Sequence, residues 1–367
     1  MRFGLFCQST RRNSSPQQSW EENLQDIIDA DELGFEETWV AEHIGGGGGQ
    51  TVIPVVDLFI CKAAALTKQM RFGPGIRNLQ FYQPVEVALQ ASVCDTLTNG
   101  RYMAGFGAAR APGEKNHMKE FGIDRDLSDE RDMVLEAIEL ILKCWTETEP
   151  FDFQGKFYHG EGILLHPRPI QKPHPPVGMA NSGTVATAEY IGQQGFFPLY
   201  YFFDTAPQLD ELATAYVEAG LAAGRSVSRN ETRLSRVVYV AETDQQALDD
   251  VRGDIEPTLD ARRAGARLRH LVRSLAPGDS LDDLNFDYLV DNGIFLVGSP
   301  ETVYQRIKEF YDEMGGFGML LTLIGHQIGT LEQRKRSRKL FMEEVAPRLR
   351  QLTPDPNQLV ATMTPAY

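Results

Sequence analysis

The chain has 367 residues, of which 42% are hydrophobic and 24% are charged, a balance that excludes disordered and fibrous proteins. Acidic residues outnumber Lys and Arg by 51 to 36, and the net charge of −15 argues against nucleic acid as a partner, because phosphate backbones need a basic face. The length allows one large barrel or two smaller domains.

The chain carries no recognisable targeting or membrane segment. Its apolar start turns polar at Gln8 without a secretory signal pattern, and no later stretch has the roughly twenty apolar residues of a membrane span. The four cysteines lie far apart without a Cys-x-x-Cys motif, and no pair of histidines has metal-ligand spacing. These features predict a cytoplasmic protein with no metal site, no disulfide framework and no membrane partner.

Strands and helices alternate regularly through the first hundred residues. Strands are expected to begin at Arg2, Phe35, Met70 and Arg101. Helices are expected over residues 20–33, capped by Ser19, and over 54–67 and 84–97, the last with proline in its first turn. This alternation is typical of βαβ units in a parallel sheet.

The alternation is looser after residue 107. The pattern predicts a helix over 128–145, a hairpin or irregular excursion over 151–166, and helices over 184–194, 206–223, from 244 onward and over 301–314. Four further strands are expected to begin at Val177, Phe196, Arg233 and Phe317. Residues 262–291 fit no clean period and indicate an insertion, and we interpret the basic run 334–339 in a late helix as a solvated face.

Eight strands alternating with helices favour a (β/α)8 TIM barrel with insertions at its C-terminal face over an open doubly wound sheet. No Gly-x-Gly-x-x-Gly motif follows the first strand, which weakens a dinucleotide-binding alternative. We expect one domain over residues 1–348 and a C-terminal tail over 349–367.

The most informative stretch is 34–49, which reads as a helix stop, a short strand, the pair Glu42-His43 and five glycines. Loops after the carboxyl ends of parallel strands carry the chemistry of such barrels. Neighbours on an extended strand point to opposite faces, so at most one of the pair is expected to enter the barrel, and we favour His43 because imidazole exchanges protons near neutral pH. The alternative is that His43 satisfies a loop carbonyl and Glu42 is solvated.

Three other strand ends carry candidate ligand-binding residues. The glycines of 73–78 either let backbone lie against a flat ligand or form a tight turn. Arg110, after the fourth strand, either pairs with a phosphate or is surface charge. In 180–187 a strand ends in small and polar residues before a helix, which favours anion binding, although helix capping also explains Ser182 or Thr184.

Four stretches taken in order resemble the bacterial luciferase-like flavin monooxygenase family, over residues 1 to about 344. They are Leu33–His43, Arg77–Pro84 leading to Asp95–Arg101, Ala180–Thr184 and Gly298–Val303. The resemblance implies a (β/α)8 barrel that binds reduced FMN (FMNH2), supplied by a separate NAD(P)H:flavin reductase, at its C-terminal mouth. It also implies that molecular oxygen would add to the flavin to give a C4a-peroxyflavin, which would oxygenate an organic substrate.

The resemblance also implies roles for individual residues. His43 matches the catalytic histidine that transfers protons, whereas Ile44 replaces the second histidine, which argues against aldehyde-type luciferase chemistry. Gly75-Ile76 falls where a non-prolyl cis peptide underlies the flavin ring, and residues 262–291 correspond to a mobile shielding loop. Arg110 stands slightly after the expected phosphate-binding arginine. The implied cofactor-binding residues are Gly75, Ile76, Phe106, Arg110, Asn181, Ser182, Gly183, Thr184 and Val185, and the candidate substrate contacts are Phe6, Phe81, Tyr82 and Phe202.

Three functional hypotheses follow. The leading one is an FMNH2- and oxygen-dependent monooxygenase that hydroxylates, epoxidises or performs Baeyer–Villiger insertion on a small apolar organic substrate. The second is a relative that uses a deazaflavin for hydride transfer, and the third is a non-catalytic partner subunit. The resemblance further implies a homodimer, formed through the helices after the second and third strands.

Overall fold

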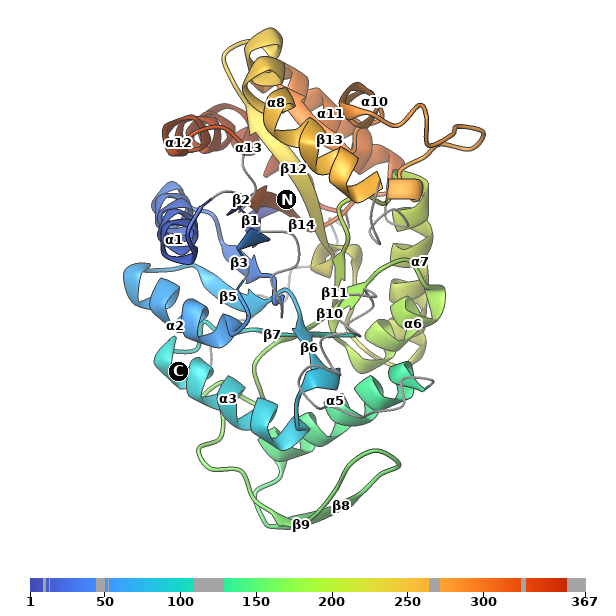
Figure 1. Cartoon of the computed structure of the whole chain (residues 1–367). Coiled ribbons are helices and arrows are strands. Elements are labelled where there is room, and N and C mark those ends of the chain that lie inside the picture. Colours follow the sequence, from blue (N-terminus) through green and yellow to red (C-terminus); the bar gives the residue numbers. More distant parts are fainter. Residues whose placement is uncertain are drawn as a thin grey trace.

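Eight parallel strands in chain order form a barrel in the computed structural model (Figure 1), which describes residues 1–8, 11–12, 14–43, 50–51, 53–108, 129–263, 271–324 and 328–354. The last strand, β14, pairs with the first, β1. A parallel bridge between Phe72 of β5 and Tyr102, just before β7, closes the barrel between those two strands. The expected (β/α)8 barrel is therefore confirmed. The barrel strands are β1 (Arg2–Cys7), β3 (Glu37–Val40), β5 (Arg71–Pro74), β7 (Ala104–Gly107), β10 (Val177–Asn181), β11 (Phe197–Tyr200), β12 (Arg233–Val240) and β14 (Met319–Ile324).

Helices surround this barrel (Figure 1). They are α1 (Pro16–Leu33), α2 (Val56–Leu66), α3 (Pro84–Leu97), α5 (Glu130–Thr146), α6 (Val185–Gln194), α7 (Ala206–Ala222), α8 (Asp244–Arg263), α10 (Phe286–Asp291), α11 (Pro300–Glu313), α12 (Leu331–Leu340) and α13 (Ala346–Leu349). Shorter elements are β2 (Arg11–Arg12), β4 (Gln50–Thr51), β6 (Arg77–Asn78), β8 (Phe151–Gln154), β9 (His159–Ile163), β13 (Phe295–Gly298), single turns at Leu79–Phe81 and Arg229–Glu231, and a π-turn at Phe341–Val345. In the described ranges, none of the helices has the length and apolar character that crossing a bilayer requires.

Most predicted element boundaries are close to the observed ones. Each barrel strand begins at its predicted residue or up to three residues later, and residues 151–163 form the antiparallel hairpin β8–β9, which projects away from the barrel in Figure 1. The predicted start of the first helix was wrong. α1 begins at Pro16, and the Ser15 hydroxyl accepts a hydrogen bond from the Gln18 N–H at 3.1 Å, whereas Ser19 is buried within the helix. The Ser-Pro pair was the stronger start signal.

Two elements near the irregular region were missed. β13 pairs with the second half of β12, and the six-residue helix α10 buries Phe286, Leu289 and Val290. β13 is buried along its whole length, so its sequence has no polar alternation, and α10 is too short to show a helical period. Residues 264–270 of the expected mobile loop lie outside the described residues.

The basic run in α12 is only partly a solvated face, which corrects its interpretation. Arg334 and Arg338 are buried and bind Asp26 of α1, with Arg334 Nε 3.1 Å from Oδ2 and Arg338 Nη2 2.7 Å from Oδ1. These two arginines are four residues apart, so they share the face of α12 that packs on α1. Lys335 and Lys339 lie on the exposed side.

The half of the barrel interior at the amino-terminal ends of the strands is filled by side chains. Glu37 of β3 and Arg233 of β12 form a buried ion pair of 3.0 Å, and the Trp39 indole N–H donates to the same carboxylate at 3.0 Å. A Cβ on Gly73 would lie 2.4 Å from the Trp39 ring, so this glycine makes room for the indole rather than for a ligand. Because these side chains close the amino-terminal half, the barrel has room for a ligand toward the carboxyl ends of its strands.

Candidate active site

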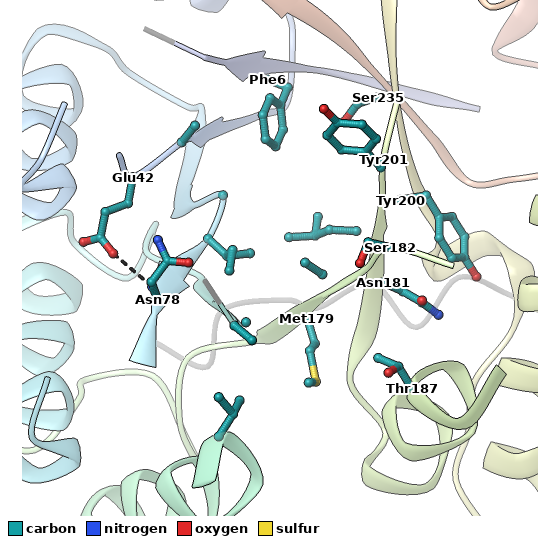
Figure 2. A pocket seen from close by; sticks show the side chains of 18 of the residues that line it. Phe6, Glu42, Asn78, Met179, Asn181, Ser182, Thr187, Tyr200, Tyr201 and Ser235 are labelled. Atoms are coloured by element: carbon teal, nitrogen blue, oxygen red, sulfur yellow. Dashed lines mark hydrogen bonds between the residues drawn. The ribbon is translucent and has the colours of Figure 1, made fainter. Parts of the chain in front are cut away.

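A cavity of about 500 Å³ lies at the carboxyl ends of the barrel strands (Figure 2). Its volume is in the range of pockets that hold cofactors and small substrates. Residues of β1, β3, β5, β7, β10, β11 and β12, or of the loops directly after these strands, reach it, together with residues from α5, α6 and the segment between α8 and α10. The position agrees with the expectation that the C-terminal face of a barrel carries its ligand site.

Glu42 and His43 both line this cavity, although they are sequence neighbours. The regular strand β3 ends at Val40, so the alternation of an extended strand no longer separates the two side chains. The expectation that at most one of them enters was therefore wrong, and so was the alternative that Glu42 is solvated, because Glu42 is only 2% exposed. His43 is half-buried, and its backbone N–H donates to the Ile53 carbonyl at 3.2 Å.

Glu42 is held by polar partners on the strand-to-helix segment after β5. Its carboxylate accepts hydrogen bonds from the Asn78 N–H at 2.9 Å (Figure 2) and from the Tyr82 hydroxyl at 2.8 Å. Arg77 Nε lies 3.5 Å away, and Arg77 also binds Asp57. Burial raises the pKa of Glu42 to about 7, since these partners only partly offset its lost solvation. Sequence reasoning named Glu42 but preferred His43, because a carboxylate with its ordinary pKa exchanges protons poorly near neutral pH.

Replacing Glu42 with glutamine is expected to remove a pH-dependent part of the stability. The pKa of Glu42 is higher in the folded than in the unfolded chain, so the folded state binds more protons below about pH 7 and loses stability as the pH rises. Relative to Glu42→Gln, the wild-type free energy of unfolding should fall by about 2 kcal/mol from pH 5 to pH 7. Urea unfolding across this range measures the difference, and parallel pH curves for the two proteins would contradict it.

The wall of the cavity is largely apolar. The Gly75–Ile76 peptide bond is cis, as the resemblance implied, and both residues line the cavity. A Cβ on Gly75 would lie 2.9 Å from the Phe6 ring, so glycine allows close contact between backbone and ring. Such a wall suits a flat, mainly apolar group. Its other apolar side chains include those of Val134, Leu135, Met179, Leu199 and Phe202.

A polar turn between β10 and α6 lies across the cavity from Glu42 (Figure 2). Asn181 Oδ1 accepts hydrogen bonds from the N–H groups of the two residues before α6, at 3.0 and 3.1 Å. Thr184 is the N-cap residue of α6, yet its hydroxyl donates to Thr187 at 2.7 Å and does not cap the helix. Capping thus does not explain Thr184, and the first N–H groups of α6 have no acceptor within the helix.

Two arginines reach the same end of the cavity. Arg131 of α5 donates from Nη2 to the Ala186 carbonyl at 3.3 Å, and Arg273 donates from Nε to Asp204 Oδ1 at 2.5 Å. Sequence reasoning selected neither, because Arg131 reads as a solvated residue in the first turn of a helix and Arg273 lies in the patternless region. Arg110, the arginine that it did select, lies outside the described residues.

The predicted site residues divide into two groups. Phe106 faces away from the cavity and stacks on Trp145 of α5, with ring centroids 6.2 Å apart. Phe81, Tyr82, Gly183, Thr184 and Val185 are also not among the lining residues, and their roles in binding stay predictions. The predicted residues that line the cavity are Phe6, His43, Gly75, Ile76, Asn181, Ser182 and Phe202.

Known proteins resemble the chain over most of its length. A family model described as luciferase-like monooxygenase matches residues 1–316. The 4-hydroxyprotoasukamycin monooxygenase of Streptomyces nodosus subsp. asukaensis is 29% identical over 330 residues, which cover 87% of this chain and 84% of that protein. The F420-dependent glucose-6-phosphate dehydrogenase of Amycolatopsis mediterranei is 26% identical over 336 residues, which cover 89% of this chain and 93% of that protein.

A solved structure shares both fold and extent. It is the oxygenating constituent of the 3,6-diketocamphane monooxygenase of Pseudomonas putida, described as a type II Baeyer–Villiger monooxygenase in complex with FMN. It is similar to this chain with a TM-score of 0.82 and 25% sequence identity. The match covers 95% of this chain and 98% of that chain, so the likeness extends to the strand ends around the cavity.

Proposed function

The chain belongs to the luciferase-like monooxygenase family, and on this premise we propose that it uses FMNH2 and molecular oxygen to oxygenate a small apolar organic substrate. The reaction would be a hydroxylation, an epoxidation or a Baeyer–Villiger insertion. The observation that carries the proposal is the apolar cavity at the strand ends, with Glu42 and His43 on its lining and the polar turn 181–184 across from Glu42. The FMN complex of a relative supports FMN as the cofactor.

The described residues fit FMN in two respects. The apolar wall beside Gly75 and Ile76 suits the flavin ring, and the turn before α6, with Arg131 and Arg273 near it, offers donors to a phosphate. Bound FMNH2 would supply the electrons that activate oxygen. In this proposal His43 holds or moves a proton beside the ring, and the apolar side chains exclude water from the reaction.

We also propose a separate NAD(P)H:flavin reductase as the source of FMNH2. The relative in complex with FMN is described as the oxygenating constituent of its monooxygenase, which supports a division of labour between two proteins. Purified chain without a reductase should therefore consume oxygen only when reduced flavin is added.

Rapid mixing of the protein and photoreduced FMN with oxygenated buffer tests the proposed function. A transient absorbance that differs from both reduced and oxidised FMN, together with slowed formation of oxidised FMN, would support it. Reoxidation as fast as that of free FMNH2 would contradict it. Titration with a deazaflavin would then test hydride transfer, which the name of one F420-dependent relative describes.

We further propose that two copies of the chain associate through α2 and α3. These adjacent helices expose Leu58 and Leu66 of α2 and Leu89, Val93 and Leu97 of α3, each 38% to 73% exposed. The three positions on α3 are four residues apart and form one stripe. An apolar face of this kind typically marks a protein interface.

A double substitution, Val93→Lys with Leu97→Lys, is expected to make the protein monomeric at micromolar concentration. Two ammonium groups would lose their solvation in the proposed interface. Sedimentation velocity measures the mass, and Leu221→Lys, at a 53% exposed leucine of α7, serves as the control that keeps the wild-type mass. A wild-type protein that sediments as a monomer would contradict the proposed dimer.

A further inference from the structure

We propose that Arg273 binds the phosphate monoester of the flavin and so selects FMN over an unphosphorylated flavin. The inference rests on the FMN-dependent function proposed above. Arg273 comes from the segment between α8 and α10, where no sequence motif marks it, and nevertheless lines the cavity. Three features of its surroundings carry the inference.

The first feature is its contact with the turn before α6. An ideal Cβ on Gly183 would lie 2.1 Å from Nη1 and 2.2 Å from Nη2 of Arg273. Gly183 also has a φ of +98°, a conformation that L side chains rarely adopt. Glycine is therefore needed here on two counts, and its missing side chain lets the guanidinium lie at the start of α6.

The second feature is the number of donors left for a ligand. Arg273 donates a hydrogen bond from Nε to Asp204 Oδ1 at 2.5 Å. None of the described residues accepts a hydrogen bond from its Nη1 or Nη2. Asp204 is itself fixed, because the buried Arg236 donates from Nη2 to its carbonyl at 2.5 Å. Asp204 thus orients the guanidinium and leaves its two terminal amino groups for an anion.

The third feature is the charge at this end of the cavity. Arg131 also lies at the start of α6, where its Nη2 donates to the Ala186 carbonyl, and the helix dipole adds positive potential. Asp204 offsets part of this charge. A phosphate monoester, which carries close to two negative charges at neutral pH, matches the remaining field and the planar fork of Arg273. The ribityl hydroxyl of riboflavin in the same place would gain little from either.

Anaerobic titration of the protein with FMNH2 and with reduced riboflavin, which differ only in the phosphate, tests the inference. Arg273→Ala should weaken FMNH2 binding about 10- to 100-fold and change the affinity for reduced riboflavin less than about twofold. Arg273→Lys keeps the charge but loses the planar fork, so its affinity for FMNH2 should lie between those of the wild type and of Arg273→Ala. Arg252→Ala, which removes an arginine paired with Asp287 away from the cavity, should change neither affinity.

The outcomes separate this inference from the proposed function. If Arg273→Ala weakened both flavins equally, or weakened neither, Arg273 would not bind the phosphate and the inference would be overturned. If Arg273→Ala unfolded, the comparison of the two flavins in Arg273→Lys would decide in the same way. A wild-type protein that bound neither flavin would instead contradict the FMN-dependent function itself.

Discussion

Replacing Glu37 with alanine is expected to destabilise the folded chain by about 3–5 kcal/mol. The Glu37 carboxylate is 2% exposed and accepts hydrogen bonds from Arg233 Nε at 3.2 Å and Nη2 at 3.0 Å. Arg233 is 1% exposed and stacks on the Phe197 ring, 3.7 Å from its centroid. Without Glu37, this guanidinium charge stays buried without its main partner. The unfolded state, in which water solvates the charge, becomes more favourable relative to the folded state.

Equilibrium urea unfolding at neutral pH measures this loss. The double variant Glu37→Leu with Arg233→Met should recover most of it, because apolar side chains of similar size need no solvation. The matched control is Arg252→Ala, which breaks the exposed pair with Asp287 and should cost at most about 1 kcal/mol. A loss for Glu37→Ala as small as that of the control would show that the buried pair contributes little.

The Glu37–Arg233 pair also makes the free energy of unfolding depend on pH in the acidic range. Burial opposes ionisation of Glu37, but the nearby arginines, Arg233 first, outweigh it and lower the pKa to about 2. The folded pKa lies below the unfolded one, so this stabilisation is complete above about pH 4.3 and disappears as the pH falls through about 2. Between neutral pH and about pH 2, the wild type should lose about 3 kcal/mol more than Glu37→Gln.

The barrel could be predicted from the sequence because its strand–helix units are local patterns. Residues 84–97, for example, form the observed α3 because proline opens the helix and Asn99-Gly100 follows its end. β13 could not be predicted, since four residues buried on both faces show no alternation and are recognised only by their partner β12. Ser19 competed with Ser15 as a cap, and the prediction overlooked that Pro16 favours the earlier start.

Part of the candidate site was also visible in the sequence. The strand ends at His43, Gly75 and Asn181 were singled out, and all three line the cavity. Glu42 was named beside His43 but ranked below it, because its raised pKa depends on burial and on hydrogen bonds from Asn78 and Tyr82, which lie more than thirty residues away in the chain. Arg273 was missed for the same reason, since only the folded chain places it against Gly183. Residue types and spacing locate strand ends, whereas electrostatics depends on distant neighbours.

Replacing His43 with alanine is expected to lower the rate of product formation at least about tenfold, while FMNH2 affinity stays within about twofold. His43 lines the cavity, so it can exchange a proton with a bound ligand, whereas the polar turn that would bind the phosphate comes from β10 and α6. The measurement needs a substrate, found by screening apolar ketones and alkenes. His159→Ala, in the exposed hairpin strand β9 (Figure 1), is the matched control.

Glu42 also lines the cavity, so the result for His43 needs the comparison with Glu42→Gln. If Glu42 acts only by holding Asn78 and Arg77, its variant should lose flavin affinity and leave the rate with saturating flavin nearly unchanged. The double variant should then be as slow as His43→Ala. Suppose instead that His43→Ala forms product at the wild-type rate and that Glu42→Gln is slow. Glu42 would then be the residue that exchanges the proton, because both side chains line the same cavity.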